Sequence, residues 1–202
     1  MKIREHNGHM GINLSWMKWM GFVLFFAFLS YTQVYADSRE EFLKDLGGDF
    51  TLTNQDNKPF ALKELRGKVV FIFFGYTFCP DICPTALSEA KAIRNMLGDV
   101  KDRMVVVFIS VDPERDKPEI LKKYLANFDP SFIGLTGSAE EVAAVAKLYR
   151  SGFKKAKVES AGGYLIDHTS YFYMVNKKGA LSNIFSRNSN RNMIVHSIKE
   201  LF

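Results

Sequence analysis

The sequence has few of the residues that stabilise small secreted scaffolds or bind nucleic acids. Only two of its 202 residues are cysteine, too few for a scaffold built on several disulfides. The formal net charge of +5 is too weak a basic excess to indicate a nucleic-acid-binding protein. Hydrophobic residues make up 47% of the chain and aromatic residues 14%, so a sizeable core is expected. The length fits one domain with a short additional segment.

The longest uncharged run of the sequence lies near the N-terminus. Residues 19–31 (WMGFVLFFAFLSY) carry no charge and follow three basic residues, Lys2, Arg4 and Lys18. The run ends shortly before Val34-Tyr35-Ala36, which suits a signal peptidase. A membrane helix needs ~20 apolar residues, a length that this run reaches only by including Lys18 or Thr32 and Gln33. Residues 1–36 are therefore predicted to be a signal peptide cleaved after Ala36, with an uncleaved membrane anchor in residues 16–36 as the alternative.

Both interpretations of the leader place residues 37–202 on the far side of a membrane. The leader is short and not rich in arginine or serine, which is typical of a bacterial export signal rather than a mitochondrial presequence. We therefore expect the domain in the bacterial periplasm, attached to the inner membrane if residues 16–36 remain as an anchor.

The exported part of the chain alternates segments that favour strands with segments that favour helices. Two continuous apolar runs, at 69–75 and 104–111, predict strands buried on both faces, as in a parallel sheet. The other predicted elements are an N-terminal hairpin at 50–62, helices at 84–97, 118–128 and 138–149, a strand at 132–135, a hairpin at 169–185 and a helix at 190–202. Ser138 and Glu141 form a capping box. This order predicts an α/β, thioredoxin-like fold with a central mixed sheet flanked by helices.

The two cysteines lie together in the segment GYTFCPDICPTAL, after the first buried strand and at the start of the next helix. Pro84 suits the first helical position, which places Cys83 beside the N-cap and Cys79 in the preceding turn. Free backbone N–H groups and the helix dipole favour thiolates there. The C-x-x-x-C spacing allows the sulfurs to converge on a metal ion or to form a disulfide. The alternative is that both cysteines are small buried apolar residues.

A dithiolate that holds copper needs a further ligand, and imidazole suits copper. His6 and His9 lie in the leader, and His196 lies in the last helix among apolar residues. His168 directly precedes the strand predicted at 169–176, which in a thioredoxin-like sheet lies beside the strand that leads to the cysteines. Position alone leaves open whether His168 binds a metal or lies on the surface at the end of a loop.

Proline is absent after Pro130. Thioredoxin-like oxidoreductases have a cis-proline at the start of the strand that begins here at Thr169, packed against the dithiol. A histidine stands near that place in this sequence, which leaves the dithiol open to a metal ion. The absence of this proline therefore favours copper binding over disulfide exchange.

Two carboxylates and a lysine cluster lie near the predicted site. Asp112, at the end of the second buried strand, is a candidate for a weak copper ligand or for a group that supports the ligands from behind. The alternative is that it only initiates the turn before Pro113. Asp167 is a candidate partner for the other ring nitrogen of His168, unless it points away. The lysines at 154, 155 and 157 lie in a stretch that reads as a solvated loop, with docking to an acidic partner as the alternative. Methionines are scattered in the exported domain, which argues against a thioether copper site.

Four segments, in order, resemble the Sco/SenC copper chaperones of cytochrome oxidase assembly. They are GGDFTLTNQDNKPFAL, FFGYTFCPDICP, SVDPERDKP and LIDHTSYFYMVN, and the resemblance spans about residues 47–200. It implies a thioredoxin-like fold, copper bound by Cys79, Cys83 and His168, and delivery of copper to the binuclear centre of cytochrome c oxidase subunit II. Family members usually carry an N-terminal membrane anchor, so the cleavable form of this leader departs from the pattern.

The sequence therefore predicts an exported copper chaperone rather than an enzyme, with oxidase subunit II as its partner. Other copper carriers or thiol reductants are further expected partners, and the oxidation state of the copper stays open between Cu(I) and Cu(II). The alternative function is that of a thiol–disulfide oxidoreductase, in which Cys79 and Cys83 reduce the cysteines of the oxidase copper site before metal arrives. A peroxiredoxin-type peroxidase fits poorly, because its single activated cysteine does not match a proline-flanked pair.

Overall fold

The structure is a computed structural model that describes residues 41–160 and 163–202. The leader predicted at 1–36 lies outside these described residues. Within the part of the chain that is described, no helix has the length and apolar character needed to cross a bilayer. The segment Phe42–Phe202 forms one unit, which contains all the elements described below.

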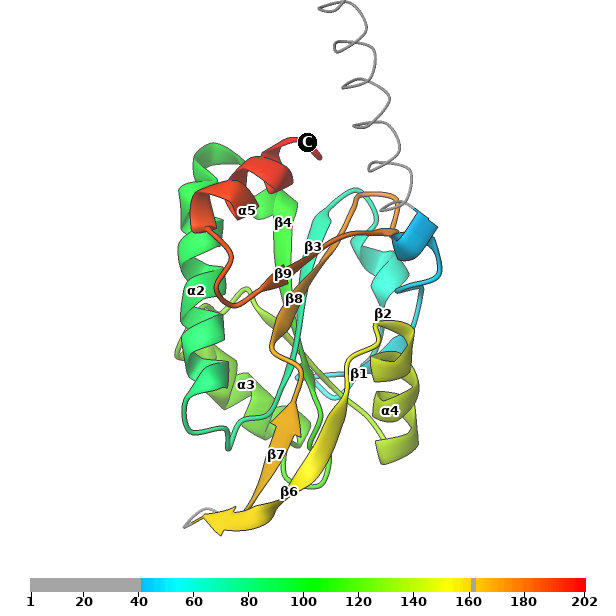
Figure 1. Ribbon diagram of the computed structural model, residues 1–202, viewed down its shortest axis with the longest axis vertical. Coiled ribbons are helices and arrows are strands. Elements are labelled where there is room, and N and C mark those ends of the chain that lie inside the picture. Colours follow the sequence, from blue (N-terminus) through cyan, green and yellow to red (C-terminus); the bar gives the residue numbers. More distant parts are fainter. Residues whose placement is uncertain (1–40, 161–162) are drawn as a thin grey trace, which may run out of the picture. The chain divides into compact units, whose positions relative to one another are not determined.

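A seven-stranded mixed sheet forms the centre of this unit, which confirms the predicted α/β class (Figure 1). Its strands are β1 Thr51–Asn54, β2 Pro59–Ala61, β3 Val69–Gly75, β4 Met104–Ser110, β5 Ile133–Thr136, β8 Tyr171–Val175 and β9 Leu181–Ser186. Their order across the sheet is β2-β1-β5-β4-β3-β8-β9. The three central strands β3, β4 and β5 are parallel, and the remaining neighbours are antiparallel. The predicted N-terminal hairpin corresponds to β1 and β2.

Helices cover both faces of the sheet (Figure 1). They are α2 Ile82–Met96, α3 Pro118–Ala126, α4 Ala139–Leu148 and α5 Arg191–Lys199, with short 3-10 segments η1 Leu62–Leu65 and η2 Gly98–Arg103. In Figure 1, α2, α3 and α5 lie on one side of the sheet and α4 on the other. The predicted capping box is present at the start of α4, where Glu141 N–H donates to Ser138 Oγ and Ser138 N–H donates to Glu141 Oε2.

Strand β3 is buried along its whole length, as its uninterrupted apolar sequence predicts. Towards one helix layer, Phe71 stacks on Phe172 of β8 with ring centroids 4.5 Å apart. Towards the other layer, Phe74 packs edge-on against Tyr173 at 5.6 Å and lies tilted against Tyr149 at 5.8 Å. Aromatic packing on both faces therefore holds β3 in place, and with it the segment that follows β3.

A second, two-stranded sheet corrects the sequence interpretation of the stretch around Lys154 as a loop. Its strands are β6 Phe153–Ser160 and β7 Gly163–His168, which pair antiparallel with Phe153 opposite His168. The register shifts between Lys155 and Glu159, and this irregularity interrupts the two-residue alternation by which a strand is recognised in sequence. In Figure 1 this hairpin extends beyond the end of the main sheet where the β3–α2 connection lies.

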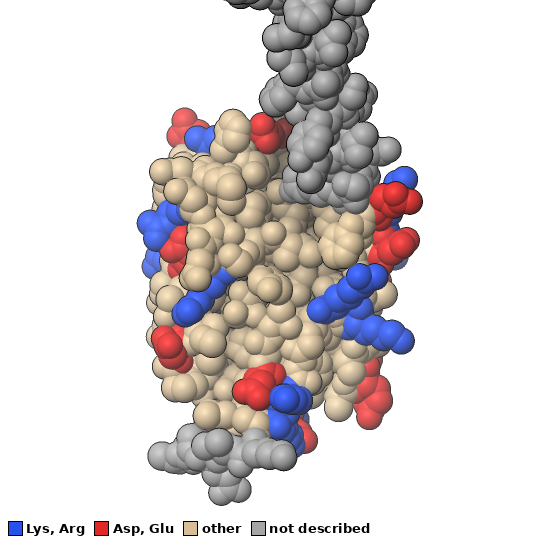
Figure 2. Space-filling model, viewed as in Figure 1, with Lys and Arg blue, Asp and Glu red and all other residues tan. Residues whose placement is uncertain are grey.

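Charged side chains on the face shown in Figure 2 lie mainly around its margin, with both signs interspersed. The centre of that face, over the region of β8 and β9, is uncharged. This distribution agrees with the sequence of β9, LSNIFS, which contains no charged residue.

Gly75, the last residue of β3, leaves no room for a side chain. A Cβ atom there would lie 2.7 Å from Cys83 Sγ and 2.8 Å from the Phe108 ring. We expect Gly75→Ala to lower the free energy of unfolding by about 1–3 kcal/mol through overpacking. Urea denaturation measures this change, with Gly152→Ala as the control, because the nearest atom to a Cβ there is 3.8 Å away. Equal urea midpoints for the two variants would contradict the expectation.

Candidate metal centre

Both cysteines lie where β3 passes into α2. Cys79 is in the connecting turn, whereas Cys83 is the second residue of α2, which begins at Ile82. The helix therefore starts two residues before the predicted start at Pro84. Pro84 is accommodated because backbone N–H groups in the first helical turn have no partner inside the helix. The early start places the Cys83 side chain on the helix itself, where it is fully buried.

His168, the last residue of β7, reaches the cysteines from the other sheet. Its Nε2 lies 3.4 Å from Cys83 Sγ. The ligand atoms of Cys79, Cys83 and His168 all lie within 4.8 Å of one another. The structure therefore brings together the three residues that the sequence singled out, although 85 positions separate Cys83 from His168 in the chain.

The spacing of these three atoms fits a single metal ion. Bonds of about 2.3 Å to sulfur and about 2.0 Å to nitrogen place the ligands of one ion roughly 3.5–4 Å apart. Two thiolates and an imidazole form a soft ligand set that suits copper, and also zinc. Within the described residues, no other group of three histidine, cysteine or acidic side chains comes together in this way.

The two thiols differ sharply in acidity. A hydrogen bond from the Cys83 thiol holds the pKa of Cys79 far below its usual range, at about 3, although burial opposes this shift. The backbone N–H groups of Cys83 and Asp81 lower the pKa of Cys79 further. Burial raises the pKa of Cys83 well above its usual range, and the neighbouring Cys79 sulfur adds to this effect. The pair therefore exists as a Cys79 thiolate beside a Cys83 thiol, and a metal bound by both sulfurs must displace the Cys83 proton.

The imidazole of His168 is held on several sides. Its Nδ1 lies 3.1 Å from the carbonyl oxygen of Thr169, and a proton on Nδ1 leaves the Nε2 lone pair free to face the sulfurs. The rings of Phe73 and Tyr76 meet it edge-on, at centroid distances of 6.0 and 5.7 Å. The orientation of the ring is therefore suited to metal binding through Nε2.

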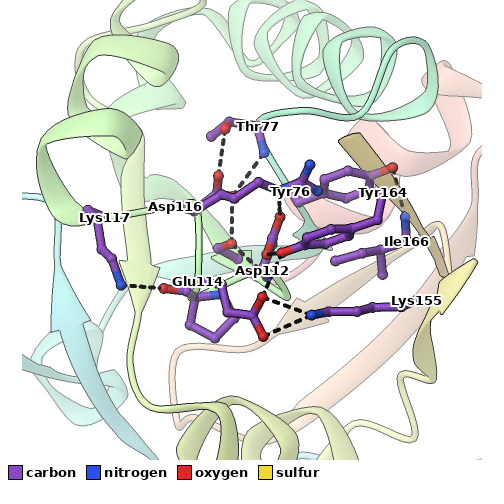
Figure 3. Close-up of polar contacts among 12 residues, drawn as sticks. Tyr76, Thr77, Asp112, Glu114, Asp116, Lys117, Lys155, Tyr164 and Ile166 are labelled. Carbon is purple, nitrogen blue, oxygen red and sulfur yellow. Dashed lines mark hydrogen bonds and ion pairs between the residues drawn. The ribbon is translucent and has the colours of Figure 1, made fainter. Parts of the chain in front are cut away.

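Asp167 and Asp112, the two carboxylates that the sequence suggested for the metal site, bond to other groups or face solvent. The side chain of Asp167 is exposed, and the partner of His168 Nδ1 is the Thr169 carbonyl. Asp112 is 2% exposed, and its carboxylate accepts hydrogen bonds from Arg115 Nε and from the Tyr164 hydroxyl, the latter at 2.6 Å (Figure 3). The Asp112 carbonyl accepts the N–H of Asp116, so its backbone makes the turn proposed as the alternative.

Asp116 was not singled out from the sequence, yet it anchors the turn that carries Cys79. This fully buried carboxylate accepts hydrogen bonds from Thr77 N–H at 2.9 Å, Thr77 Oγ1 at 2.5 Å and Ser110 Oγ at 2.6 Å (Figure 3). Burial raises the pKa of Asp116, whereas these hydrogen bonds lower it. The residue belongs to the segment SVDPERDKP, but no periodicity or spacing marks it there. Only its contact with a residue 39 positions away identifies its role.

The site opens into a surface cavity of about 290 Å³. Cys79 and His168 line this cavity, whereas Cys83 does not. The other lining residues are Tyr76, Pro80, Asp81, Ile82, Leu165, Ile166 and Asp167. A group that approaches from solvent therefore meets Cys79 and His168 first.

Comparisons with known proteins show which sequences this chain resembles. The sequence profile of the SCO1/SenC family matches residues 38–202. The mitochondrial protein SCO2 of Saccharomyces cerevisiae is 39% identical over 158 residues, which cover 77% of this chain and 52% of the yeast protein. The chain thus spans about half the length of that relative.

Solved structures extend the similarity to the fold. The copper-bound structure of ScoI from Bradyrhizobium japonicum shares 39% identity with a TM-score of 0.71, covering 78% of this chain and 99% of that one. A more distant structure, of BsSco, shares 29% identity with a TM-score of 0.62, covering 79% of this chain and 94% of that one. It is described as a Sco-family oxidase assembly protein with a disulfide switch. These similarities confirm the predicted thioredoxin-like fold.

The difference between the two thiols predicts selective alkylation. Because the pKa of Cys79 is about 3, this residue stays a thiolate across the whole range from about pH 5 to 8. We expect iodoacetamide to modify Cys79 at a rate that hardly changes with pH in this range, and to leave the buried Cys83 unmodified. Peptide mass spectrometry measures both rates. In Cys79→Ser, Cys83 should react only after unfolding, and faster modification of Cys83 than of Cys79 would contradict this assignment.

Proposed function

Since the chain belongs to the SCO1/SenC family, we propose that it binds one copper ion through Cys79, Cys83 and His168 and takes part in cytochrome c oxidase assembly. We further propose that it delivers this copper to the binuclear centre of oxidase subunit II. The observation that carries the proposal is the convergence of two cysteine sulfurs from the β3–α2 segment and one imidazole nitrogen from β7, beside an open cavity. The copper bound in the related ScoI structure supports the choice of metal.

Delivery by ligand exchange agrees with the way in which the three ligands are exposed. Cys79 and His168 line the cavity, so ligands of an acceptor protein reach the metal from their side. Cys83 is fully buried, and we expect it to be the last ligand to release copper. When copper leaves, Cys83 regains a proton because burial raises the pKa of its thiol. Proton uptake by the empty site therefore assists release.

The predicted export of the domain agrees with the same function. We propose that residues 1–36 carry the domain to the bacterial periplasm, either as a signal peptide or as an inner-membrane anchor, where it meets its oxidase partner. The basic residues and the uncharged run of the leader support this proposal. The N-terminal residue of the mature protein distinguishes a cleaved leader from an anchor.

A second candidate function rests on the acidity of Cys79. A stable thiolate beside a protonated thiol is the arrangement with which a dithiol attacks a disulfide. In that reaction Cys79 bonds to one sulfur of the substrate disulfide and the other substrate sulfur leaves as a thiolate. Cys83 then loses its proton and displaces the first sulfur, which leaves a Cys79–Cys83 disulfide and a reduced substrate. The disulfide switch described for BsSco supports this alternative.

Copper titration of the reduced protein tests the ligand set. We expect one equivalent to bind tightly to the wild type, and His168→Ala to weaken binding by more than about 100-fold, because loss of a mere hydrogen-bond partner of a ligand already costs about 10–100-fold. Cys79→Ser and Cys83→Ser should lose tight binding as well. The control is His196→Ala, since His196 is exposed on α5 and pairs there with Glu200 at 3.2 Å. Undiminished affinity in His168→Ala would exclude the three-ligand site.

A separate experiment distinguishes delivery from reduction. The copper-loaded protein is mixed with the reduced, copper-free copper domain of subunit II, and metal in each protein is measured after separation. The metal-free reduced protein is mixed with the same domain in its disulfide form, and its thiols are counted. We expect copper to move in the first mixture. Thiol transfer without copper transfer would instead establish the oxidoreductase, and the absence of both would exclude both functions for this partner.

A further inference from the structure

The three proposed copper ligands do not share a rigid framework. Cys79 and Cys83 follow β3 of the seven-stranded sheet, whereas His168 ends β7 of the two-stranded sheet. The two sheets are separate, so no ladder of strand pairing joins them among the described residues. The distance between His168 and the sulfurs therefore depends on contacts other than strand pairing. These include bonds from the hairpin to the main body, such as those of Tyr164 to Asp112 and of Ile166 to Tyr76, and the bonds that close the base of the hairpin.

Thr169 closes the base of the hairpin, because it bonds to Gly152, the residue that directly precedes β6. Its hydroxyl accepts a hydrogen bond from Gly152 N–H at 2.8 Å and donates to the Gly152 carbonyl at 3.1 Å. Its backbone N–H also donates to that carbonyl, at 2.9 Å. The carbonyl oxygen of Thr169 itself lies 3.1 Å from His168 Nδ1. The Thr169 side chain thus fixes the peptide whose oxygen orients the imidazole.

Tyr76 provides a contact between the hairpin and the main body, from the side of the cysteines. It directly follows β3, is 2% exposed, and its hydroxyl accepts the backbone N–H of Ile166 at 3.1 Å (Figure 3). Ile166 and His168 lie two residues apart on β7 and therefore point to the same face of the strand. The ring of Tyr76 also meets the imidazole edge-on. Tyr76 thus ties the strand that carries His168 to the turn that carries Cys79.

We propose that the hydroxyl groups of Tyr76 and Thr169 are positioning groups that hold Nε2 of His168 against the cysteine sulfurs. Neither hydroxyl binds the metal. Without them, Cys79 keeps its place in the β3–α2 turn and Cys83 its place on α2, while the imidazole loses its fixed orientation. The protein then binds copper through the sulfurs with a weakened third ligand. This inference rests on the proposed copper-binding function, and the experiment below separates the two.

The test uses Tyr76→Phe and Thr169→Val, each of which removes one hydroxyl and keeps the size of the side chain. Thr169→Ser retains the hydroxyl and serves as the conservative variant. Tyr149→Phe is the matched control for loss of a buried tyrosine hydroxyl, because Tyr149 is 1% exposed and bonds to the Gly48 carbonyl. The two test variants act from different elements, so misfolding of one still leaves the other to decide.

We expect Tyr76→Phe and Thr169→Val to weaken copper binding by about 10–100-fold, as removal of hydrogen bonds behind a metal-binding histidine does. The imidazole nitrogen coupling in the electron paramagnetic resonance spectrum of the Cu(II)-loaded protein should weaken in parallel. Thr169→Ser should stay within about threefold of the wild type, and Tyr149→Phe should lower only the unfolding midpoint. Wild-type copper affinity in both test variants, or an equal loss in Tyr149→Phe, would overturn the proposal.

A metal-free measurement keeps the positioning role separate from copper binding. Nitrogen-15 NMR of the histidine rings in the reduced full-length protein reports which ring nitrogen of His168 carries the proton. We expect a single tautomer protonated at Nδ1 in the wild type and in Thr169→Ser, and a mixture of tautomers in Tyr76→Phe and Thr169→Val. If the wild type shows this single tautomer but binds no copper, the proposed function fails and the positioning role stands. Identical ring signals in all variants would overturn the positioning role itself.

Discussion

Burial of strand β3 on both faces is the constraint on which the arrangement of the site depends. All seven of its residues pair with β4 on one side, Val70 to Phe73 pair with β8 on the other, and aromatic rings cover both faces. Because no polar group interrupts the strand, its end is held firmly where the cysteine turn begins. The pairing of Phe73 with Phe172 also places the start of β8, and so the residues just after His168, at the same end of the sheet.

The chemistry of the site follows from unequal burial of two like groups. Cys83 is inside the core, where low polarity favours the neutral thiol, and that thiol in turn stabilises the thiolate of Cys79 nearer the surface. The same asymmetry serves a metal carrier and a dithiol reductant, because both need one ready thiolate and one reserve thiol. His168 favours the first role, since it adds a third soft ligand that disulfide exchange does not require.

Two of the proposed ligands lie in the β3–α2 segment and the third lies at the end of β7. This division suits a protein that must both hold and release a metal. A site built entirely within one sheet resists opening, because ladder hydrogen bonds break cooperatively. Here the imidazole is held by a few side-chain contacts around Tyr76 and Thr169. Such contacts are strong enough to orient a ligand and few enough for it to be exchanged. The open cavity beside Cys79 and His168 gives an acceptor access to the same atoms.

The sequence by itself determined the features that depend on neighbouring residues: the buried runs of β3 and β4, the capping box of α4, the terminal hairpins and the paired cysteines. Resemblance to a known family added the ligand role of His168, which position alone left open. Tertiary structure decided the early start of α2, the β6–β7 hairpin, and the partners of Asp112, Asp116 and the His168 ring. The β6–β7 hairpin has an irregular strand register, and the contacts of Asp112 with Tyr164 and of Asp116 with Thr77 join residues far apart in the chain. Local periodicity carries no information about such contacts, because folding alone brings those residues together.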